Sequence, residues 1–394
     1  MTKHKVKPFI YQNIFIPFKV FFLRRKKIIT VAFVLSDLSK WKTEPLYKKM
    51  ISHPRFHPVI FVIPFRKYTN SKSMKSSLKS YLKDKGYEYY CPRKRFKFTD
   101  YIKSDIIFYQ EPYKDLYDIN KRYYHYPHSL FCYVPYTYNL LALHNFYDQP
   151  LFDYVWQFYL GNEFLKPFIS KYLNHKDINL VVTGFPFSDE LLSAFSDGPD
   201  FEPKKKKTII WAPHHSMTDS SWLHFSTFLR YCDYMLHLAD KYKEDISIVF
   251  KPHPLLMTKL YQVWGQERTD DYYARWAYGK NTQLVTGDYI SLFSNSDAMI
   301  HDCGSFTIEY LYTKKPVMYL INDEHHSDQL NEFDKMAFNL HYKGRCEDDI
   351  ESFINNVIKG IDKMKNERLK FYDDYLIPPN GTSASDNIIH AILG

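Results

Sequence analysis

Short apolar runs that alternate with stretches of helical spacing are the main pattern of this sequence. Residues 28–35 form an apolar, β-branched run, and Ser36-Asp37-Leu38-Ser39 after it is typical of a helix cap. Further short runs recur along the chain, at residues 59–64, 106–109, 180–184, 209–211, 246–250, 283–285, 298–300 and 317–320. Alternating strands and helices predict an α/β fold with doubly wound parallel sheets.

The length predicts more than one domain. A chain of 394 residues exceeds the size at which a single hydrophobic core stops growing. Residues 196–207 combine turn formers with four lysines and are typical of a linker. We therefore expect this order along the chain: a basic segment 1–27, a first Rossmann-like domain 28–195, a linker 196–207, a second Rossmann-like domain 208–375, and a last segment 376–394 with a helix at 384–393.

One stretch predicts a strand, a small-residue turn, a helix and a second strand within residues 297–320. The apolar residues 298–300 run into Cys303-Gly304-Ser305, whose small side chains let backbone N–H groups face a ligand. Glu309 lies one helical turn beyond Ser305, so both share a face that can hold a diphosphate and a ribose hydroxyl. Lys314-Lys315-Pro316 ends the helix.

Two other strand ends carry chemistry of the same kind. The run 246–250 leads into Lys251-Pro252-His253-Pro254, where two prolines fix the direction of one imidazole. The run 208–211 leads into Ala212-Pro213-His214-His215-Ser216. Open α/β sheets bind ligands at the carboxyl ends of their strands, so three strand ends are expected to face a nucleotide diphosphate.

Five motifs, in this order, resemble those of the CDP-glycerol glycerophosphotransferase family, the teichoic-acid and capsule polymerase type of GT-B enzyme. They are Gly184–Asp189, Ala212–His214, Lys251–Pro254, His301–Ser305 with Glu309-Tyr310, and Asn380–Asp386. The resemblance implies a GT-B fold, in which two such domains face each other across a cleft and the final helix crosses back onto the first domain.

The motifs depart from the family pattern at five positions. Phe187 replaces an Arg, His214 a Thr, Cys303 and Gly304 a Tyr and a Ser, and Glu309 an Asp. These changes leave the fold prediction intact and leave the donor open, with CDP-glycerol, CDP-ribitol or another nucleotide-activated unit as alternatives.

The resemblance implies transfer of a glycerol phosphate or related polyol phosphate from a CDP-activated donor to a hydroxyl of a polysaccharide, lipid-linked or teichoic-acid-like acceptor. Such a transfer needs donors on the phosphates and a base for the acceptor hydroxyl. We expect His253 to act as phosphate-side donor or acid with Lys251, Gly304 and Ser305 to hold phosphate, and Glu309 to bind ribose. The base is expected at His128 or His125. The remaining predicted binding residues are Pro213, His214, His215, Ser216, His301, Asp302, Cys303 and Phe306.

Two other functional classes stay open. A GT-B glycosyltransferase that uses a UDP-, GDP- or CMP-sugar in capsule or lipopolysaccharide synthesis fits the same fold. A non-enzymatic scaffold predicts that no nucleotide binds. No cofactor is expected, and no metal either, because the histidine and carboxylate pairs lack zinc-site spacing. The absence of Gly-x-Ser-x-Gly disfavours an α/β-hydrolase.

The basic N-terminus and the cysteines indicate where in the cell the protein is located. Residues 1–27 hold eight Lys or Arg and no acid among large apolar residues, which suits an anionic membrane surface. A basic start to the first domain, with its apolar residues packed inside, is the alternative. Nucleic acid is not an expected partner, because no recognition module accompanies the net charge of +9. Five cysteines without a C-x-x-C pair predict reduced thiols in the cytoplasm. The basic segment adds, as one of its two alternatives, a peripheral position on the inner face of a bacterial membrane.

Aromatic residues are unusually frequent, with 35 Tyr and 31 Phe. An AT-rich genome is the simplest expected cause. Stacking on sugars or bases is the alternative at a few positions.

Overall fold

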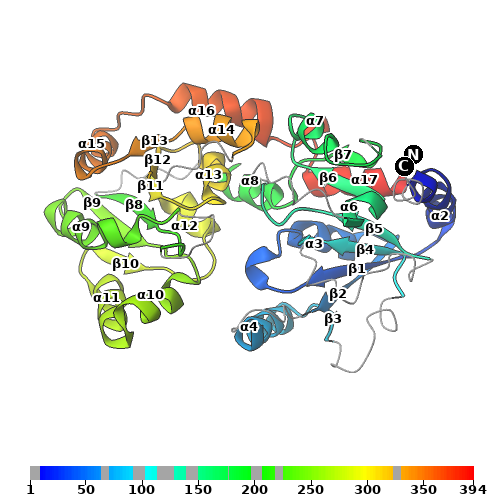
Figure 1. The fold of residues 1–394 in the computed structure, drawn as a ribbon, viewed down its shortest axis with the longest axis horizontal. Coiled ribbons are helices and arrows are strands. Elements are labelled where there is room, and N and C mark those ends of the chain that lie inside the picture. The colour runs from blue at the N-terminus through cyan, green and yellow to red at the C-terminus, as the bar shows by residue number, and fades with distance from the viewer. Residues whose placement is uncertain are drawn as a thin grey trace. The chain divides into compact units, whose positions relative to one another are not determined.

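The computed structural model describes residues 9–63, 71–91, 103–112, 128–138, 150–175, 177–196, 206–217, 225–322 and 330–394, which divide into two units (Figure 1). Unit 1 comprises Met1–Glu190 and Leu376–Gly394, and unit 2 comprises Leu191–Tyr375. His125 and most of the predicted linker lie outside the described residues.

Unit 1 is built on a seven-stranded parallel sheet of order β3-β2-β1-β4-β5-β6-β7. The strands are β1 (Ile29–Leu35), β2 (Phe56–Val62), β3 (Tyr89–Tyr90), β4 (Ile106–Tyr109), β5 (Leu130–Tyr133), β6 (Gln157–Leu160) and β7 (Leu180–Val182). The chain runs from β1 outward to β3, then returns to place β4 on the other side of β1. The strand order therefore reverses between the neighbouring strands β1 and β4, which mark the topological switch point of this sheet.

Helices cover both faces of this sheet. They are η1 (Tyr11–Phe15), α2 (Ile16–Arg25), η2 (Leu38–Lys40), α3 (Glu44–Ser52), α4 (Ser71–Asp84), α6 (Pro150–Tyr154), α7 (Leu165–Ser170), η9 (Pro379–Gly381) and α17 (Ala384–Leu393). A further helix, α8 (Ser188–Ser196), begins in unit 1 and continues into unit 2. Residues of α2, α3, α4 and α17 share one apolar core with every second residue of β1. On the other face Tyr133 packs edge-on against Phe152 of α6, with ring centroids 5.1 Å apart.

Unit 2 is built on a six-stranded parallel sheet of order β10-β9-β8-β11-β12-β13. The strands are β8 (Lys207–Ala212), β9 (Ile246–Phe250), β10 (Thr282–Leu284), β11 (Ala298–His301), β12 (Val317–Leu320) and β13 (Tyr342–Gly344). Its switch point lies between β8 and β11.

The helices of unit 2 alternate with these strands. They are α9 (Phe228–Lys241), α10 (Leu256–Trp264), α11 (Gln266–Tyr278), α12 (Ile290–Asn295), α13 (Phe306–Glu309), η6 (Tyr310–Thr313), α14 (Glu332–Asn339), α15 (Glu347–Ile358), α16 (Lys365–Phe371) and η8 (Tyr372–Leu376). Trp211 at the end of β8 stacks on Phe228 and Phe250, with centroids 5.6 and 5.0 Å away, and Trp276 packs 5.5 Å away. Aromatic side chains thus fill much of this core.

Two parallel sheets with flanking helices confirm the predicted α/β class. Residues 89–90, 130–133, 157–160 and 342–344 form strands that the sequence did not predict. The helix expected after Ser305 is a single α-turn that continues as the 3₁₀ turn η6, and Lys314 ends it in the left-handed conformation (φ 62°).

Two of the sequence motifs meet inside unit 1. The carboxylate of Asp189 accepts the backbone N–H groups of Ala384 and Ser385 at 2.7 and 2.9 Å, at the start of α17. Gly184 has a φ of 88°, and a Cβ on it would lie 2.8 Å from the Cβ of Pro378. The Gly184–Asp189 motif therefore anchors the C-terminal segment, and glycine permits the close approach.

Candidate functional site

The candidate site of unit 2 lies where β8, β9 and β11 end. The three strands are neighbours in the sheet, and the residues that follow them are Pro213-His214-His215, Lys251-Pro252-His253 and Asp302-Cys303. This is the switch point, at which open α/β sheets bind ligands. The structure thus brings together the three strand-end motifs that the sequence singled out.

His214, His215 and His253 form one cluster of half-buried imidazole rings. Ring centroids lie 4.3 Å apart for His214 and His215, 4.2 Å for His215 and His253, and 4.9 Å for His214 and His253. The His253 N–H donates to the Pro213 carbonyl at 3.1 Å, which joins the loops after β8 and β9. Pro213 therefore acts through its backbone.

Hydrogen bonds at Nδ1 set the tautomers of two rings. Nδ1 of His253 accepts the Leu255 N–H at 3.1 Å, and Nδ1 of His214 accepts the Ser216 N–H at 3.3 Å. The Ser216 hydroxyl lies 2.8 Å from the same Nδ1 and already accepts the Phe225 N–H, so its own proton is directed to the ring. A ring nitrogen that accepts an N–H carries no proton, so the neutral ring holds its proton on Nε2. Burial, followed by the neighbouring His215, lowers the pKa of His214 to about 3, and burial likewise lowers that of His253. The cluster therefore presents neutral Nε2–H donors.

The same three histidines are the candidate metal ligands in the described part of the chain. Each offers a ring nitrogen, and these nitrogens lie within 4.8 Å of one another. A histidine that binds a metal through Nε2 carries its proton on Nδ1 and donates it. Backbone N–H groups instead point at Nδ1 of His214 and His253. The cluster therefore fits an anion better than Zn²⁺, the ion that a three-histidine set otherwise favours.

Asp302 holds the site together through backbone groups. Its Oδ1 accepts the His214 N–H, and its Oδ2 accepts the N–H and hydroxyl of Thr227 at 2.6 and 2.8 Å. The side chain is fully buried, and burial raises its pKa to about 7 against the opposing effect of these donors. Asp302 thus positions His214 and the start of α9, instead of facing a ligand.

Lys251, Tyr289 and Glu309 form a second polar group near the cluster. The Lys251 ammonium lies 6.0 Å from the centre of the Tyr289 ring. The Tyr289 hydroxyl donates to Oε2 of Glu309, whose side chain is only 1% exposed. Tyr289 carries no sequence signal, because its contact with Glu309 depends on how the loop before α12 approaches α13.

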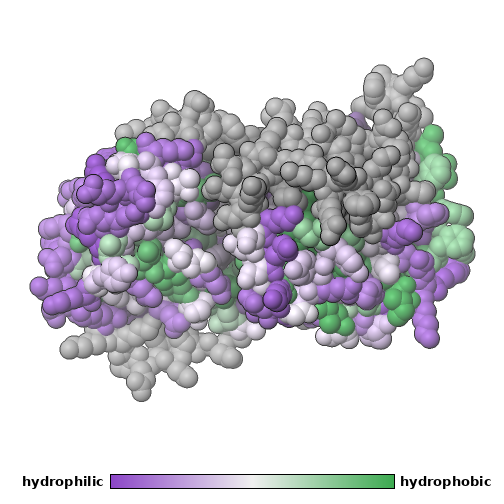
Figure 2. Space-filling model, turned by 90° about the horizontal axis from the view of Figure 1, so that it is seen from below, coloured by the Kyte–Doolittle hydropathy of each residue, from purple (hydrophilic) through white to green (hydrophobic). Residues whose placement is uncertain are grey.

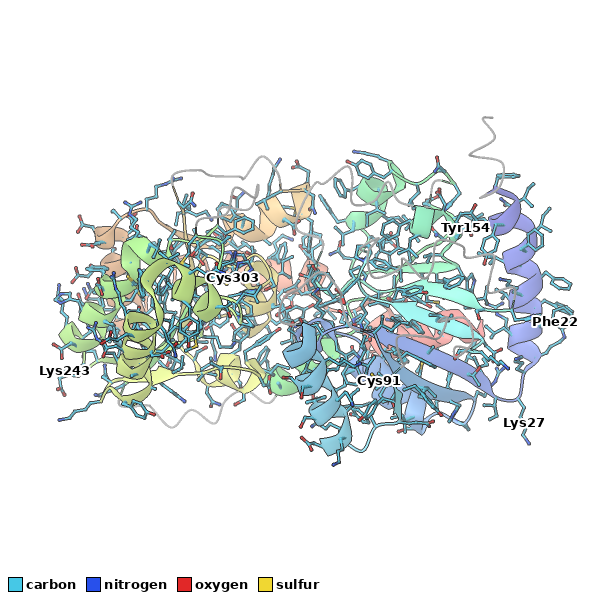
Figure 3. The ribbon with its side chains drawn as sticks, turned by 60° about the horizontal axis from the view of Figure 1, so that its bottom comes forward. Phe22, Lys27, Cys91, Tyr154, Lys243 and Cys303 are labelled. Carbon is cyan, nitrogen blue, oxygen red and sulfur yellow. The ribbon has the colours of Figure 1, made fainter. Side chains whose placement is uncertain are left out.

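Residues 303–306 connect β11 to α13. Cys303, labelled in Figure 3, is buried, and its thiol donates to the Ala212 carbonyl at 3.1 Å. Burial raises the pKa of this thiol. Gly304, Ser305 and Phe306 are half-buried. Because α13 has one turn, few aligned peptide dipoles contribute at its start.

His301 packs on the other side of β11. It is fully buried, and its ring lies 5.1 Å from the Tyr319 ring and 5.3 Å from the His341 ring. Burial lowers its pKa to about 3. The structure does not bring His301 into the histidine cluster.

In unit 1, His128 is exposed and comes before β5. The next residue, Ser129, accepts a hydrogen bond from the Lys19 ammonium on α2 at 2.9 Å. His128 therefore stands at the amino-terminal edge of the sheet, opposite the edge where parallel sheets bind ligands.

Three residues at the carboxyl-terminal edge of unit 1 drew no functional prediction. The Ser36 hydroxyl donates to Oε1 of Glu111, and the Lys40 ammonium donates to Oε2 at 2.5 Å. Ser36 follows β1 and Glu111 follows β4, so the group stands at the switch point. Only the strand order reveals this, since no motif surrounds Gln110-Glu111-Pro112.

The sequence matches one family model, described as CDP-glycerol:poly(glycerophosphate) glycerophosphotransferase, over residues 139–394. No curated protein matches the sequence. Ser36, Lys40, Glu111 and His128 precede the matched residues.

Solved structures share the fold at low sequence identity. A variant of the wall teichoic acid polymerase TagF matches with a TM-score of 0.61 and 14% identity, over 99% of this chain and 96% of that one. A UDP-N-acetylglucosamine 2-epimerase matches with a TM-score of 0.59 and 13% identity, over 93% of this chain and 96% of that one. The UDP-GlcNAc 2-epimerase of Neisseria meningitidis, bound to UDP-GlcNAc, matches with a TM-score of 0.59 and 14% identity, over 92% of this chain and 99% of that one. These proteins have GT-B type folds, so both units have the predicted architecture.

Proposed function

Because the chain belongs to the CDP-glycerol:poly(glycerophosphate) glycerophosphotransferase family, we propose that its histidine cluster binds the diphosphate of a CDP-activated glycerol or related polyol. The protein is a GT-B type transferase that moves the polyol phosphate to an acceptor hydroxyl. The observation that carries the proposal is the pair of imidazoles of His214 and His253 at adjacent strand ends, with a backbone N–H directed at Nδ1 of each ring. One of the TagF structures with a similar fold was obtained after a soak with CDPG.

The proposed chemistry needs charge stabilisation on the leaving nucleotide. The acceptor oxygen forms a bond to the polyol-bearing phosphorus, and the bond from that phosphorus to CMP breaks. Nε2–H of His253 and the Lys251 ammonium offset the charge that develops on CMP. Glu309, held by Tyr289, is proposed to orient the donor through its ribose. His215, Ser216, Gly304, Ser305 and Phe306 complete the proposed surroundings of the donor, and the base role of His128 or His125 stays a prediction.

Donor binding tests this proposal directly. Isothermal titration of CDP-glycerol, CDP-ribitol, UDP-glucose and GDP-mannose into the full chain should show binding of the cytidine compounds alone. His253→Ala should weaken that binding at least tenfold, while His237→Ala, an exposed histidine on α9, should leave it unchanged. Preference for a UDP- or GDP-sugar instead supports the glycosyltransferase alternative, and no binding of any nucleotide contradicts both.

We also propose that α2 and the turn before it form a contact with an anionic bilayer. Gln12, Ile16 and Leu23 face unit 1, and Nε2 of Gln12 donates to the Asp153 and Val155 carbonyls at 2.9 Å each. The opposite side exposes between 38% and 64% of seven side chains, Phe9, Ile10, Ile14, Phe15, Phe18, Phe21 and Phe22. Figure 2 shows this hydrophobic edge, and Figure 3 shows Phe22 on the outer side of the helix. The apolar residues of this segment are thus divided between the core and the surface.

Basic residues follow this apolar side. Arg24, Arg25 and Lys27 are exposed, whereas Lys26 pairs with Asp105 at 2.5 Å. Each basic side chain near an anionic membrane surface contributes about 1 kcal/mol, so the three exposed ones contribute about 3 kcal/mol. Among the residues that the structure describes, no helix combines the length and apolarity needed to cross a bilayer. The contact is therefore proposed to be interfacial.

Vesicle flotation tests this contact. The full chain should float with phosphatidylcholine vesicles that contain phosphatidylglycerol and should float less with pure phosphatidylcholine. A Phe18→Ser/Phe22→Ser double variant should lose flotation, while Ile178→Ser, an equally exposed residue of unit 1, should keep it. Unchanged flotation of the double variant overturns the proposal, as does loss of self-association instead of vesicle binding, which assigns the surface to a second copy.

A further inference from the structure

Tyr289, in the loop between β10 and α12, contacts segments on both sides of β8. Its hydroxyl donates to Oε2 of Glu309 on α13, the helix that follows β11. The centre of its ring lies 6.0 Å from the ammonium of Lys251, which follows β9. Since β8 lies between β9 and β11 in the sheet, Tyr289 stands at the same ligand-binding edge of unit 2 as the histidine cluster.

In this pair the carboxylate is more deeply buried than the phenol that bonds to it. Glu309 is 1% exposed, whereas Tyr289 is half-buried. A second pair in unit 2 joins Tyr242 of α9 to Glu351 of α15, with the hydroxyl 2.6 Å from the carboxylate. Tyr242 is also half-buried, but the Glu351 side chain is 24% exposed. The Tyr242 bond therefore leaves its carboxylate open to water, while Tyr289 is part of what covers Glu309.

The burial of Glu309 has a consequence for ligand binding. A ribose can reach a carboxylate that is 1% exposed only after a covering side chain moves. Moving Tyr289 alone takes a hydrogen bond from a buried anion, which costs free energy. A ribose hydroxyl is an O–H donor of the same kind as the phenol. Exchange of one hydroxyl for the other therefore keeps the number of hydrogen bonds to Glu309 unchanged.

The surroundings of Tyr289 allow its ring to move while α12 stays folded. The ring packs on Phe293 and Phe306, with centroids 4.8 and 5.1 Å away. The start of α12 is held separately, because Oδ1 of Asp288 accepts the Ile290 N–H at 3.2 Å. Rotation about the side-chain bonds of Tyr289 is thus sufficient, and such rotations are fast in side chains that reach the surface.

We propose that Tyr289 closes the Glu309 carboxylate in the donor-free protein, and that the donor opens it by exchanging a ribose hydroxyl for the tyrosine hydroxyl. The inference rests on the proposed function, because it takes Glu309 as the group that meets the ribose of a cytidine nucleotide. Tyr289 then competes with the donor for Oε2 of Glu309. A tyrosine that only held Glu309 in its binding position would act in the opposite direction.

The sign of the change in affinity tests this competition. Tyr289→Phe keeps the ring and removes the hydroxyl, so the donor no longer breaks a hydrogen bond when it binds. Isothermal titration of CDP-glycerol into the full chain should give a Kd about three- to tenfold lower than in wild type, the smaller value applying if water partly replaces the phenol. Tyr242→Phe is the matched control and should stay within about twofold of wild type. Unchanged or weaker binding by Tyr289→Phe overturns the proposal.

The ribose side of the exchange has its own measurement. In wild type, 2′,3′-dideoxy-CMP should bind at least about tenfold more weakly than CMP, because it displaces Tyr289 and offers no hydroxyl in return. Glu309→Gln should reduce this difference, and Tyr289→Phe added to Glu309→Gln should change the Kd less than it does in wild type. Equal affinities of wild type for CMP and its dideoxy analogue overturn the exchange.

Failure of this inference is distinguishable from failure of the proposed function. A wild type that binds CDP-glycerol, with no gain in affinity in Tyr289→Phe, overturns the role of Tyr289 alone. A wild type that binds neither CDP-glycerol nor CMP overturns the proposed function before any variant is compared.

Discussion

The two sheets follow one strand order and carry different chemistry at their ligand-binding ends. Numbered within each unit, the first six strands of both run 3-2-1-4-5-6. The end of unit 2 presents imidazoles and a lysine, which are suited to anions. The end of unit 1 presents the Glu111 carboxylate, which accepts hydrogen bonds from a hydroxyl and from the Lys40 ammonium. Strand order therefore determines where side chains gather. The residues after each strand determine which ligands those side chains can bind.

The largest expected effect is a loss of turnover when the histidine cluster of unit 2 is altered. His253→Ala should lower the turnover of CDP-glycerol by about 10²- to 10³-fold, because a donor to the leaving phosphate is lost. The loss should fall on the donor, with a weaker Kd for CDP-glycerol and an unchanged KM for the acceptor. Steady-state kinetics in both substrates measure this. A KM effect on the acceptor alone would place His253 on the wrong side of the reaction.

The next effect compares the two residues that brace the switch points. Asp302→Asn should destabilise unit 2 by about 3 kcal/mol, because the amide N–H₂ then faces the buried Thr227 or His214 N–H. Gln110→Met in unit 1 buries no charge and leaves one backbone N–H, that of Lys42, without its acceptor, so it should cost less, about 1 kcal/mol. Hydrogen exchange resolved by peptide reports each unit separately. Similar losses in both units contradict the prediction.

A smaller effect concerns the C-terminal anchor. Gly184→Ala in unit 1 should cost about 2 kcal/mol more than Gly287→Ala in unit 2. Both glycines have positive φ, but a Cβ on Gly184 meets Pro378 and Ala384, while nothing lies within 4 Å of one on Gly287. Thermal unfolding of the two variants measures the difference. Equal costs show that backbone conformation alone accounts for the loss.

The smallest effect, counted per pH unit, is a dependence of stability on pH. Among the residues that the structure describes, the four histidines whose pKa is lowered by burial all lie in unit 2: His214, His253, His301 and His341. The folded pKa of His301 is about 3 and the unfolded value about 6.5, so below pH 6.5 only the unfolded chain takes up this proton. The free energy of unfolding should therefore fall with pH from 6.5 to 4, by up to about 1.4 kcal/mol per pH unit from this group.

His301→Gln isolates that contribution. The slope of unit 2 stability against pH should become shallower in this variant, measured as the difference from wild type. The raised pKa of Asp302 acts in the opposite direction, because the folded chain keeps that proton up to about pH 7, and it cancels in the difference. An unchanged slope contradicts a neutral, buried His301.

The sequence predicted strands well where apolar β-branched residues end at a polar residue or proline. The run Ile246–Phe250 before Lys251-Pro252 and the run Ile106–Tyr109 match β9 and β4 at both ends. It missed β5 (Leu130–Tyr133) and β6 (Gln157–Leu160), because Phe and Tyr were attributed to genome composition and not to strands. Their rings pack in the sheet of unit 1, where Tyr133 and Phe158 lie 4.8 Å apart. Aromatic residues carry strand propensity, which was the overlooked signal.

The site was predicted where motifs mark it and missed where only topology does. His214 and His253 were found because prolines frame them after strands. Glu111 was missed because its place at the switch point depends on β4 returning beside β1, which no local pattern encodes. His301 and Asp302 lie within a recognised motif, yet their side chains serve packing and bracing. A motif thus locates a loop without telling which of its side chains face outward.

The anchoring of α17 by Asp189 has a consequence for how the chain is made. Unit 2 is one continuous stretch, whereas the core of unit 1 includes Ile388, Ile389 and Ile392, which the ribosome adds after all of unit 2. Domains generally fold as units during synthesis, amino-terminal ones first. Here that order is reversed, because unit 2 can be complete while unit 1 still lacks its last helix. The part of the apolar core that α17 covers is then exposed. The nascent chain is therefore most exposed to aggregation, and most in need of chaperones, at its earlier half.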